Sequence, residues 1–349
     1  MKKQIKKVIH FISTVLCCTV LISGCTMNTE DKVMEEGKKF SYELSDYCGE
    51  SIMEIEQEID TVQWEDEDDA ISAFDGQVLI SNHDGQITQI RLSGTGKEDF
   101  LWTLCGISPG MKLETVLEKL EQTGIVIERH NMQYYASGVD LEKMGIARLE
   151  WDPNETITYV NAVVDMSKVD ELKDYELVVK EEQFVYCDEE RNVNIVIDYP
   201  VVEVSNHQEL AEQMNGSIEE IVQEILPAEE LSGWNNISID IEYSLKNVES
   251  ERFSILWEGT LAILEGEYEV RKALTYNMLE NSVVLGIAES GWTDEQLASE
   301  LSWQLELEEE VAEQILNDQR YEFYVTPLYL VVIYEDKEAG EYQTVSVFR

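Results

Sequence analysis

The chain has 349 residues, and its 25 Lys and Arg residues face 72 Asp and Glu residues, which gives a formal net charge of −47. Such an acidic surface repels nucleic acid and anionic lipid headgroups, and it attracts basic proteins over long distances. Hydrophobic residues make up 44% of the chain, which is enough for packed cores and excludes a disordered acidic tail. The length favours two or three domains.

The first 24 residues have the features of an export signal. Residues 2–7 contain four lysines and no acidic residue, and an apolar run follows over 8–22. This run is shorter than the roughly 20 residues of a comfortable transmembrane helix and suits a signal-peptide core. An ordinary signal peptide, or a single anchor helix with a chance cysteine, is the alternative.

The run ends in Leu21-Ile22-Ser23-Gly24-Cys25, which resembles the lipobox of bacterial lipoproteins. The resemblance implies cleavage before Cys25, a lipid thioether on its thiol, and a protein held on the outer face of the cytoplasmic membrane. We therefore predict a signal peptide over 1–24 and a lipidated polar tether over 25–40. Since cleavage removes four lysines and no acid, the remaining 325 residues carry a charge of −51.

The cysteines fall into two groups. Three belong to the export and lipidation segment: Cys17, Cys18 and Cys25. The other three allow at most one internal disulfide and lack zinc-site spacing: Cys48, Cys105 and Cys187. Two interpretations stay open, which are buried free thiols and a bridge between Cys48 and Cys105.

Two segments, about 41–95 and 100–165, show the same order of features. Each has a Cys-Gly pair, then an amphipathic helix, then a turn and an alternating strand, expected over 84–92 and 154–160. The inner faces of the two helices should carry Ile52, Ile55, Ile59 and Val62, and Leu113, Val116, Leu117 and Leu120. The offset is 57 between the cysteines and 70 between the strands, so the second copy carries about 13 extra residues around 128–145.

This arrangement resembles the small repeats of beta-lactamase-inhibitor-like lipoprotein modules. The resemblance covers 41–167 and implies helices on one face of an antiparallel sheet. It also implies a binding or envelope-assembly scaffold rather than a catalyst. Two unrelated α+β segments that share Cys-Gly by chance are the alternative.

Residues 182–349 predict a larger α+β domain. Period-two alternation predicts strands over 193–199, stopping at Pro200, and over 237–245 and 253–261. A helix between them buries Leu210, Met214, Ile218, Ile221, Val222 and Ile225. A capping box over 293–296 opens another helix, with Leu297 and Leu301 inside, and a second helix carries Val311 and Ile315. The last strands lie within 321–334 and near 340–342.

The ending Phe323-Tyr324-Val325-Thr326-Pro327, the Tyr199-Pro200 strand end and the preceding helix pair look like the extracellular domain of lysozyme-sensing anti-sigma factors. That domain also occurs beside some peptidoglycan deacetylases. The resemblance implies recognition of a lysozyme-like muramidase. Two departures stand against a full match. Gly266-Glu267-Tyr268-Glu269 replaces a Gly-Ala-His-Pro-like stretch, and cleavage leaves no cytoplasmic sigma-binding segment, so direct anti-sigma action is not expected.

The sequence offers no recognisable catalytic, cofactor or metal site. The three remaining histidines are far apart and are expected at the surface or at helix caps: His83, His130 and His207. No nucleophile elbow, zinc-protease motif, phosphate loop or dinucleotide fingerprint occurs. The acidic run 65–69 lacks the glycine of a calcium loop, so we expect a solvated loop. The glutamates of 306–310 are expected at a helix start.

We therefore predict an α+β protein with two tandem helix-on-antiparallel-sheet modules and a larger C-terminal α+β domain. Its predicted function is that of a non-enzymatic cell-surface lipoprotein that binds or senses a protein or cell-wall ligand. The predicted partners are the membrane, through the anchor, and a basic protein such as a lysozyme, with no nucleic acid and no cofactor. The alternatives are a peptidoglycan-modifying enzyme or its accessory subunit, and a structural envelope spacer.

The lipid site gives the first prediction. Cys25→Ala should leave the protein unlipidated, because no other residue can take the thioether. Metabolic labelling with an alkyne fatty acid measures this directly. Label that persists on the variant would contradict the lipobox interpretation.

Overall fold

The computed structural model describes residues 42–60, 62–67, 69–94, 102–122, 124–226, 233–264, 266–286, 293–317, 321–336 and 341–348. The signal peptide, Cys25 and the tether lie outside the described residues. None of the described helices is both long enough and apolar enough to span a bilayer.

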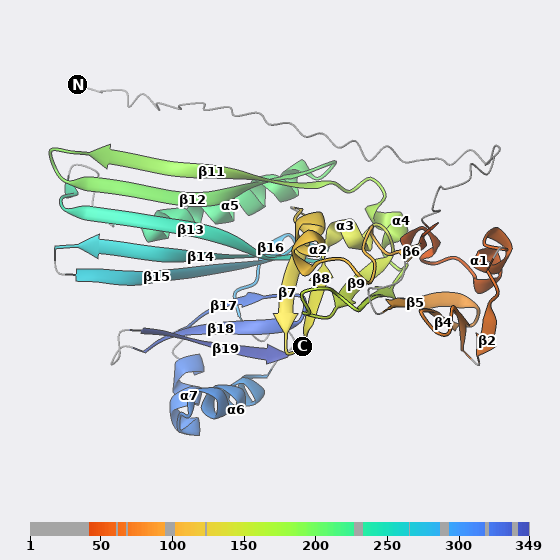
Figure 1. The fold of residues 1–349 in the computed structure, drawn as a ribbon. Coiled ribbons are helices and arrows are strands. Elements are labelled where there is room, and N and C mark those ends of the chain that lie inside the picture. The colour runs from red at the N-terminus through yellow and green to blue at the C-terminus, as the bar shows by residue number, and fades with distance from the viewer. Residues whose placement is uncertain are drawn as a thin grey trace. The chain divides into compact units, whose positions relative to one another are not determined.

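The described residues confirm the α+β class, with antiparallel sheets and packed helices (Figure 1). The largest sheet has eight strands: β2 (Glu65–Glu67), β3 (Ala70–Ala73), β4 (Val78–His83), β5 (Gln86–Ser93), β7 (Val126–His130), β8 (Gln133–Ser137), β9 (Ile146–Trp151) and β10 (Tyr159–Val164). Their order is β2-β3-β4-β5-β10-β9-β8-β7. Each repeat thus gives a four-stranded meander, and β5 pairs with β10 to join the two.

Each meander is preceded by its own helix. Helix α1 (Ile52–Glu58) begins with a capping box at Ser51, and α2 (Leu113–Leu120) occupies the matching place in the second repeat. Ile55 and Val116 are both fully buried in one apolar core that also contains strand residues from both meanders. The predicted inner faces of these helices are therefore confirmed.

The extra residues of the second repeat lie only partly within the expected range 128–145, since the β9–β10 connection over 152–158 is also longer than its counterpart over 84–85. Helix α3 (Val139–Glu142) connects β8 to β9, whereas a short turn connects β3 to β4 in the first repeat. The strand expected over 154–160 begins only at Tyr159, so its predicted start is wrong. The reason is Asp152, whose buried carboxylate accepts the backbone N–H groups of Thr158 at 2.6 Å and Tyr159 at 3.0 Å and so holds the preceding residues in a loop.

A six-stranded sheet follows, in the order β11-β12-β13-β14-β15-β16. Its strands are β11 (Leu177–Asp188), β12 (Val193–Val204), β13 (Ile237–Val248), β14 (Arg252–Ile263), β15 (Gly266–Asn277) and β16 (Ser282–Val283). Only β12 and β13 are parallel neighbours, and α5 (Gln208–Ile225) forms the crossover between them. Figure 1 shows α5 lying along this sheet, and its buried face contains Ala211, Met214, Ile218, Val222 and Ile225.

The expected end of β12 at Pro200 is wrong, because the strand continues to Val204. Pairing between β12 and β13 ends at Ile197 with Ile241. The N–H of Val202 points away from β11 and donates to Asn215 Oδ1 of α5 at 2.8 Å. Alternate residues of a strand direct their N–H groups to the same side, so position 200 faces the same side as Val202. The missing N–H of Pro200 therefore removes no hydrogen bond to β11.

The last three strands, β17 (Tyr321–Val325), β18 (Tyr329–Asp336) and β19 (Glu341–Phe348), form a sheet whose middle strand, β18, is buried on both faces. Val331 and Ile333 pack with Leu256 of β14, while Leu330 and Val332 pack with the helix pair. The predicted buried strand near residues 328–334 is therefore confirmed.

The helix pair is α6 (Asp294–Leu305) and α7 (Glu309–Asn317). The capping box of Thr293 and Gln296 is confirmed, and two glutamates lie in the first turn of α7 as expected. The predicted second helix carries Val311 and Ile315 as expected, and the Val311 side chain is 40% exposed. The buried residues of α7 are Ala312, Ile315 and Leu316.

The second repeat also contacts the six-stranded sheet. Val126 and Val139 belong to the same apolar core as that sheet. Glu142 accepts the backbone N–H of Ser250 at 2.8 Å, and Lys168 bridges Glu142 at 3.3 Å. These contacts join the two parts, whereas the domain limits expected at 167 and 182 stay a prediction.

The shared core of the two repeats gives the second prediction. Ile55→Ala should lower the free energy of unfolding by about 2–5 kcal/mol, because it leaves a cavity at a fully buried site. Met53→Ala on the same helix removes a side chain that is 65% exposed and should change it by less than about 0.5 kcal/mol. Urea unfolding measures both values, and equal effects would contradict the burial of this helix face.

Candidate binding surface

The face of the eight-stranded sheet opposite α1 and α2 carries polar and aromatic side chains. The strand register places one residue of each strand in a single row across this outer face. The row consists of Glu65, Ser72, Leu79, Arg91, Asn161, Glu150, Tyr135 and Glu128. We call the part on β5, β10, β9 and β8 the outer-face network, formed by Gln89, Arg91, Gln133, Tyr135, Arg148, Glu150, Tyr159 and Asn161.

Two arginines in this network lie over tyrosine rings. The guanidinium carbon of Arg91 is 5.3 Å from the ring centre of Tyr159, and that of Arg148 is 5.5 Å from the ring centre of Tyr135. Gln133 connects the two phenols, because its amide donates to the Tyr159 hydroxyl at 2.6 Å and accepts from the Tyr135 hydroxyl at 2.6 Å. Both rings are thus fixed before any ligand binds.

Amide and carboxylate groups complete the network. Asn161 is only 5% exposed; it accepts from Gln89 Nε2 at 2.7 Å and donates to Glu150 Oε2 at 3.2 Å. The other oxygen of Glu150 pairs with Arg148 at 2.7 Å. Since these buried polar atoms are satisfied by one another, the face remains ordered although it is not covered by apolar packing.

Burial raises the pKa of Tyr135 and of Tyr159 above the ordinary value of 10.0. For Tyr135, the Glu150 carboxylate raises the pKa further while Arg148 opposes it. For Tyr159, the hydrogen bond from Gln133 opposes the rise. Both phenols therefore stay neutral at physiological pH and remain available as amphipathic contacts.

One end of the outer face is covered by the C-terminal sheet. The ring of His130 in β7 lies 5.2 Å from that of Tyr329 and 5.7 Å from that of Phe348. Burial raises the pKa of the neighbouring Glu128 carboxyl, although hydrogen bonds from Thr326 and Leu328 lower it in part. The outer-face network begins on the next strand and is only partly buried.

Burial also lowers the pKa of Lys246, whose ammonium lies 5.7 Å from the ring centre of Tyr324. Glu258 and Glu128 oppose this shift, and Arg271 adds to it. Lys246 of the six-stranded sheet and Glu128 of the second repeat therefore both lie at this covered edge, where burial partly excludes water.

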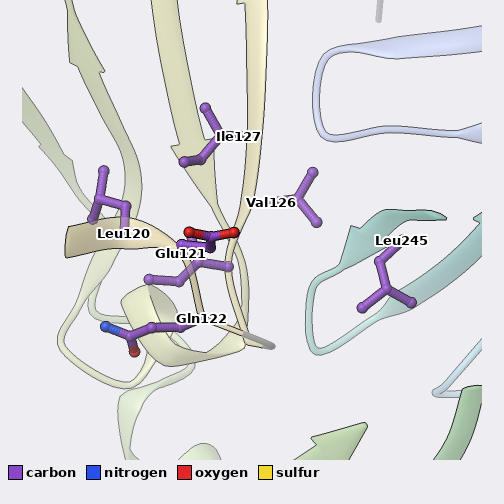
Figure 2. A pocket seen from close by; sticks show the side chains of 7 residues that line it. Leu120, Glu121, Gln122, Val126, Ile127 and Leu245 are labelled. Carbon is purple, nitrogen blue, oxygen red and sulfur yellow. The ribbon is translucent and has the colours of Figure 1, made fainter. Parts of the chain in front are cut away.

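A shallow hollow of about 400 Å³ lies near the same edge (Figure 2). Its lining consists of Leu120, Glu121, Gln122, Ile125, Val126, Ile127 and Leu245. Only two of these side chains are polar, so the hollow lacks the converging polar groups that orient a small substrate.

The three histidines are not brought together. His83 is exposed and lies 3.7 Å from Asp84, His130 stacks at the β7 edge, and His207 is the N-cap residue of α5. The expected surface or cap positions are confirmed for His83 and His207. Across the described ranges, no group of three or more His, Cys, Asp or Glu side chains could hold a metal ion.

The acidic run at 65–69 differs from the expected loop. Glu65–Glu67 form the edge strand β2, and Asp68 lies outside the described residues. Charged side chains on an edge strand prevent its pairing with another chain, so the run has a structural explanation. Cys25, the one predicted site residue, also lies outside the described residues.

The outer-face network was missed by sequence reasoning. The alternating pattern predicted a strand in each repeat, but the pairing between these distant strands was not visible. A signal did exist in the local composition, because this acidic chain places two arginines and three tyrosines on these four strands.

No family model matches the chain, and no curated protein matches its sequence. Among solved structures, it is similar to a DUF3298 family member from Bacteroides fragilis, with 10% identity, a TM-score of 0.32, and coverage of 50% of this chain and 90% of that one. A DUF3298 family protein from Pseudomonas aeruginosa shows 14% identity, a TM-score of 0.28, and coverage of 50% and 89%.

An extracellular protein containing an SCP domain, from Bacillus anthracis, shows 10% identity, a TM-score of 0.23, and coverage of 44% of this chain and 54% of that one. The chain is thus structurally similar to DUF3298 proteins and to one extracellular protein. At these identities and TM-scores, the similarity carries no argument about ligands or activity.

The covered edge gives the third prediction. Because the folded pKa of Glu128 lies above its ordinary value of 4.5, its stabilising contribution is fully present below pH 4.5 and is lost as pH rises through the folded pKa. Glu128→Gln removes this titration, so the variant should gain stability relative to the parent in the window that opens as pH rises above the ordinary value of 4.5.

Urea unfolding at four pH values within this window measures the difference. Glu118→Gln on the exposed face of α2 is the matched control and should show no such trend. A difference between parent and Glu128→Gln that does not change with pH would contradict the burial of this carboxyl.

Proposed function

We propose that this protein is a lipid-anchored binding protein on the outer side of the bacterial cytoplasmic membrane, and that its ligand is a basic folded protein. The observation that carries the proposal is the outer-face network, an ordered and partly exposed sheet face with two arginine–tyrosine pairs. Tyrosine and arginine are the residue types that contribute most binding energy at protein interfaces.

Charge supports the choice of a basic partner. The mature chain carries −51, since the 24 residues removed contain four lysines and no acid. This charge raises the rate of encounter with a basic protein, and the attraction weakens as added salt shortens the Debye length. The two rigid tyrosines then supply contact area with little loss of conformational entropy.

The candidate ligand is a lysozyme-like muramidase, as implied by the resemblance of 182–349 to the extracellular domain of lysozyme-sensing anti-sigma factors. That resemblance assigns recognition to 182–349, whereas the outer-face network lies on 86–161. Ligand identity and ligand surface are therefore tested separately.

Ligand identity is tested by titrating residues 26–349 with a lysozyme, first at low salt and then near 0.3 M, roughly twice the physiological ionic strength. This fragment contains the whole compact unit Ser41–Arg349. We expect binding that persists at 0.3 M, because a packed interface depends less on screening than long-range attraction does. A comparably basic cytochrome c is the control. Lysozyme binding that vanishes with salt, or equal binding of the control, would reject lysozyme as the ligand.

The surface is tested with the double variant Tyr135→Ala and Arg148→Ala, which should weaken binding at least about tenfold if these residues are anchors. The matched control is Tyr268→Ala with Lys180→Ala, which also removes one exposed tyrosine and one exposed cation. Full binding by the first variant would show that the ligand contacts another surface and would overturn the outer face as the site.

A further inference from the structure

Cys48 and Cys105 occupy equivalent places in the two repeats and contact the same apolar core. Cys48 is the C-cap residue of the short 3₁₀ helix η1 (Leu44–Tyr47) and is 7% exposed. Cys105 lies in a two-residue turn directly after β6 (Trp102–Thr103) and is partly buried. Both are free thiols in this structure.

The turn is unusual for a cysteine. Leu104 and Ile107 exchange two backbone hydrogen bonds of 2.8 Å, and the residues between them have positive φ, 51° for Cys105 and 71° for Gly106. Such turns favour Gly, Asn or Asp at the first central position. Gly has no Cβ, and Asn and Asp tolerate positive φ better than other residues, whose side chains are strained there. The cysteine therefore occupies a position that backbone preference alone would not assign to it.

Glu43 holds this strained turn in place. Its carboxylate accepts the N–H groups of Cys105 and Gly106, one on each oxygen, both at 2.7 Å. Glu43 belongs to β1 (Tyr42–Glu43), which pairs in parallel with β6. The turn that carries Cys105 is thus fixed against the segment that leads into Cys48.

Ser45 joins the two cysteines more closely. Its hydroxyl oxygen accepts the N–H of Cys105 at 3.3 Å, and its backbone carbonyl accepts the N–H of Cys48 at 3.2 Å. The backbones of the two cysteines are thus joined through one residue, and the charge of Cys105 is among the causes that raise the pKa of Cys48. Burial raises the pKa of both thiols to about 12.

We propose that Cys48 and Cys105 form a disulfide after export and so cross-link the two repeats. In the reaction, Cys105 attacks the disulfide of an extracytoplasmic thiol–disulfide oxidoreductase, and Cys48 then displaces the enzyme from the mixed disulfide. The two cysteines lose two electrons and two protons, and the oxidoreductase leaves as a dithiol.

The timing follows from burial. Because only the thiolate attacks, thiols with a pKa of about 12 react very slowly near pH 7. The bond is therefore expected to form while the repeats fold, before the core closes over Cys48. Once made, it is protected from reductants by the same burial.

The experiment counts thiols in residues 26–349 exported to an oxidising compartment and purified without reductant. This fragment holds three cysteines, including the exposed Cys187. After denaturation, maleimide should label one thiol per chain, rising to three after reduction, and the Cys187→Ser variant should show none before reduction. Reduction should also lower Tm by on the order of 10 °C, because it opens a long covalent loop.

Two results would overturn the proposal. One is the labelling of three thiols per chain before reduction. The other is a peptide map that links Cys187, rather than Cys105, to Cys48. The Cys48→Ser variant keeps only Cys105 and Cys187, so it should raise the count before reduction to two; a count of zero would reveal a Cys105–Cys187 bridge and would also contradict the pairing.

Discussion

The pairing of β5 with β10 is the constraint on which the rest of the structure depends. A single four-stranded meander with one short helix is near the lower size limit of an independently stable domain, because so small a unit buries a low fraction of its surface. Antiparallel pairing of the last strands of the two repeats doubles the sheet and merges the two helix-covered faces into one core. It also fixes the register that aligns Arg91 with Asn161 on the other face.

The two faces of this sheet meet different surroundings. Helices cover the inner face, and the C-terminal strands cover the outer face near β7. The strands between carry polar side chains that satisfy one another across the ladder, from Gln89 through Asn161 to Glu150. A sheet face of this kind is stable in water and also offers fixed tyrosine and arginine side chains to a partner. The proposed binding role thus depends on the contrast between the inner face, which helices cover, and the outer face, which stays partly exposed.

Much of the local structure was predictable from the sequence. The amphipathic stripes at Ile55 and Val116, the capping box at Thr293 and the buried strand near Leu330 all follow from local periodicity and cap chemistry, and all are confirmed. The predicted strand bounds were wrong where a tertiary contact determines where a strand begins or ends. Asn215 of α5 bonds Val202 in the part of β12 that continues beyond Pro200, and Asp152 delays the start of β10. The outer-face network depends on strand order, which a period-two pattern does not contain.

We propose that the outer face of the eight-stranded sheet is the ligand-binding surface. Hydroxyl-radical footprinting of residues 26–349, with and without bound lysozyme, examines this face residue by residue. We expect protection of Tyr135 and Tyr159, with no change at Tyr268 or Trp303, which are 49% and 77% exposed elsewhere. Unchanged reactivity of Tyr135 and Tyr159 in a saturated complex would contradict it.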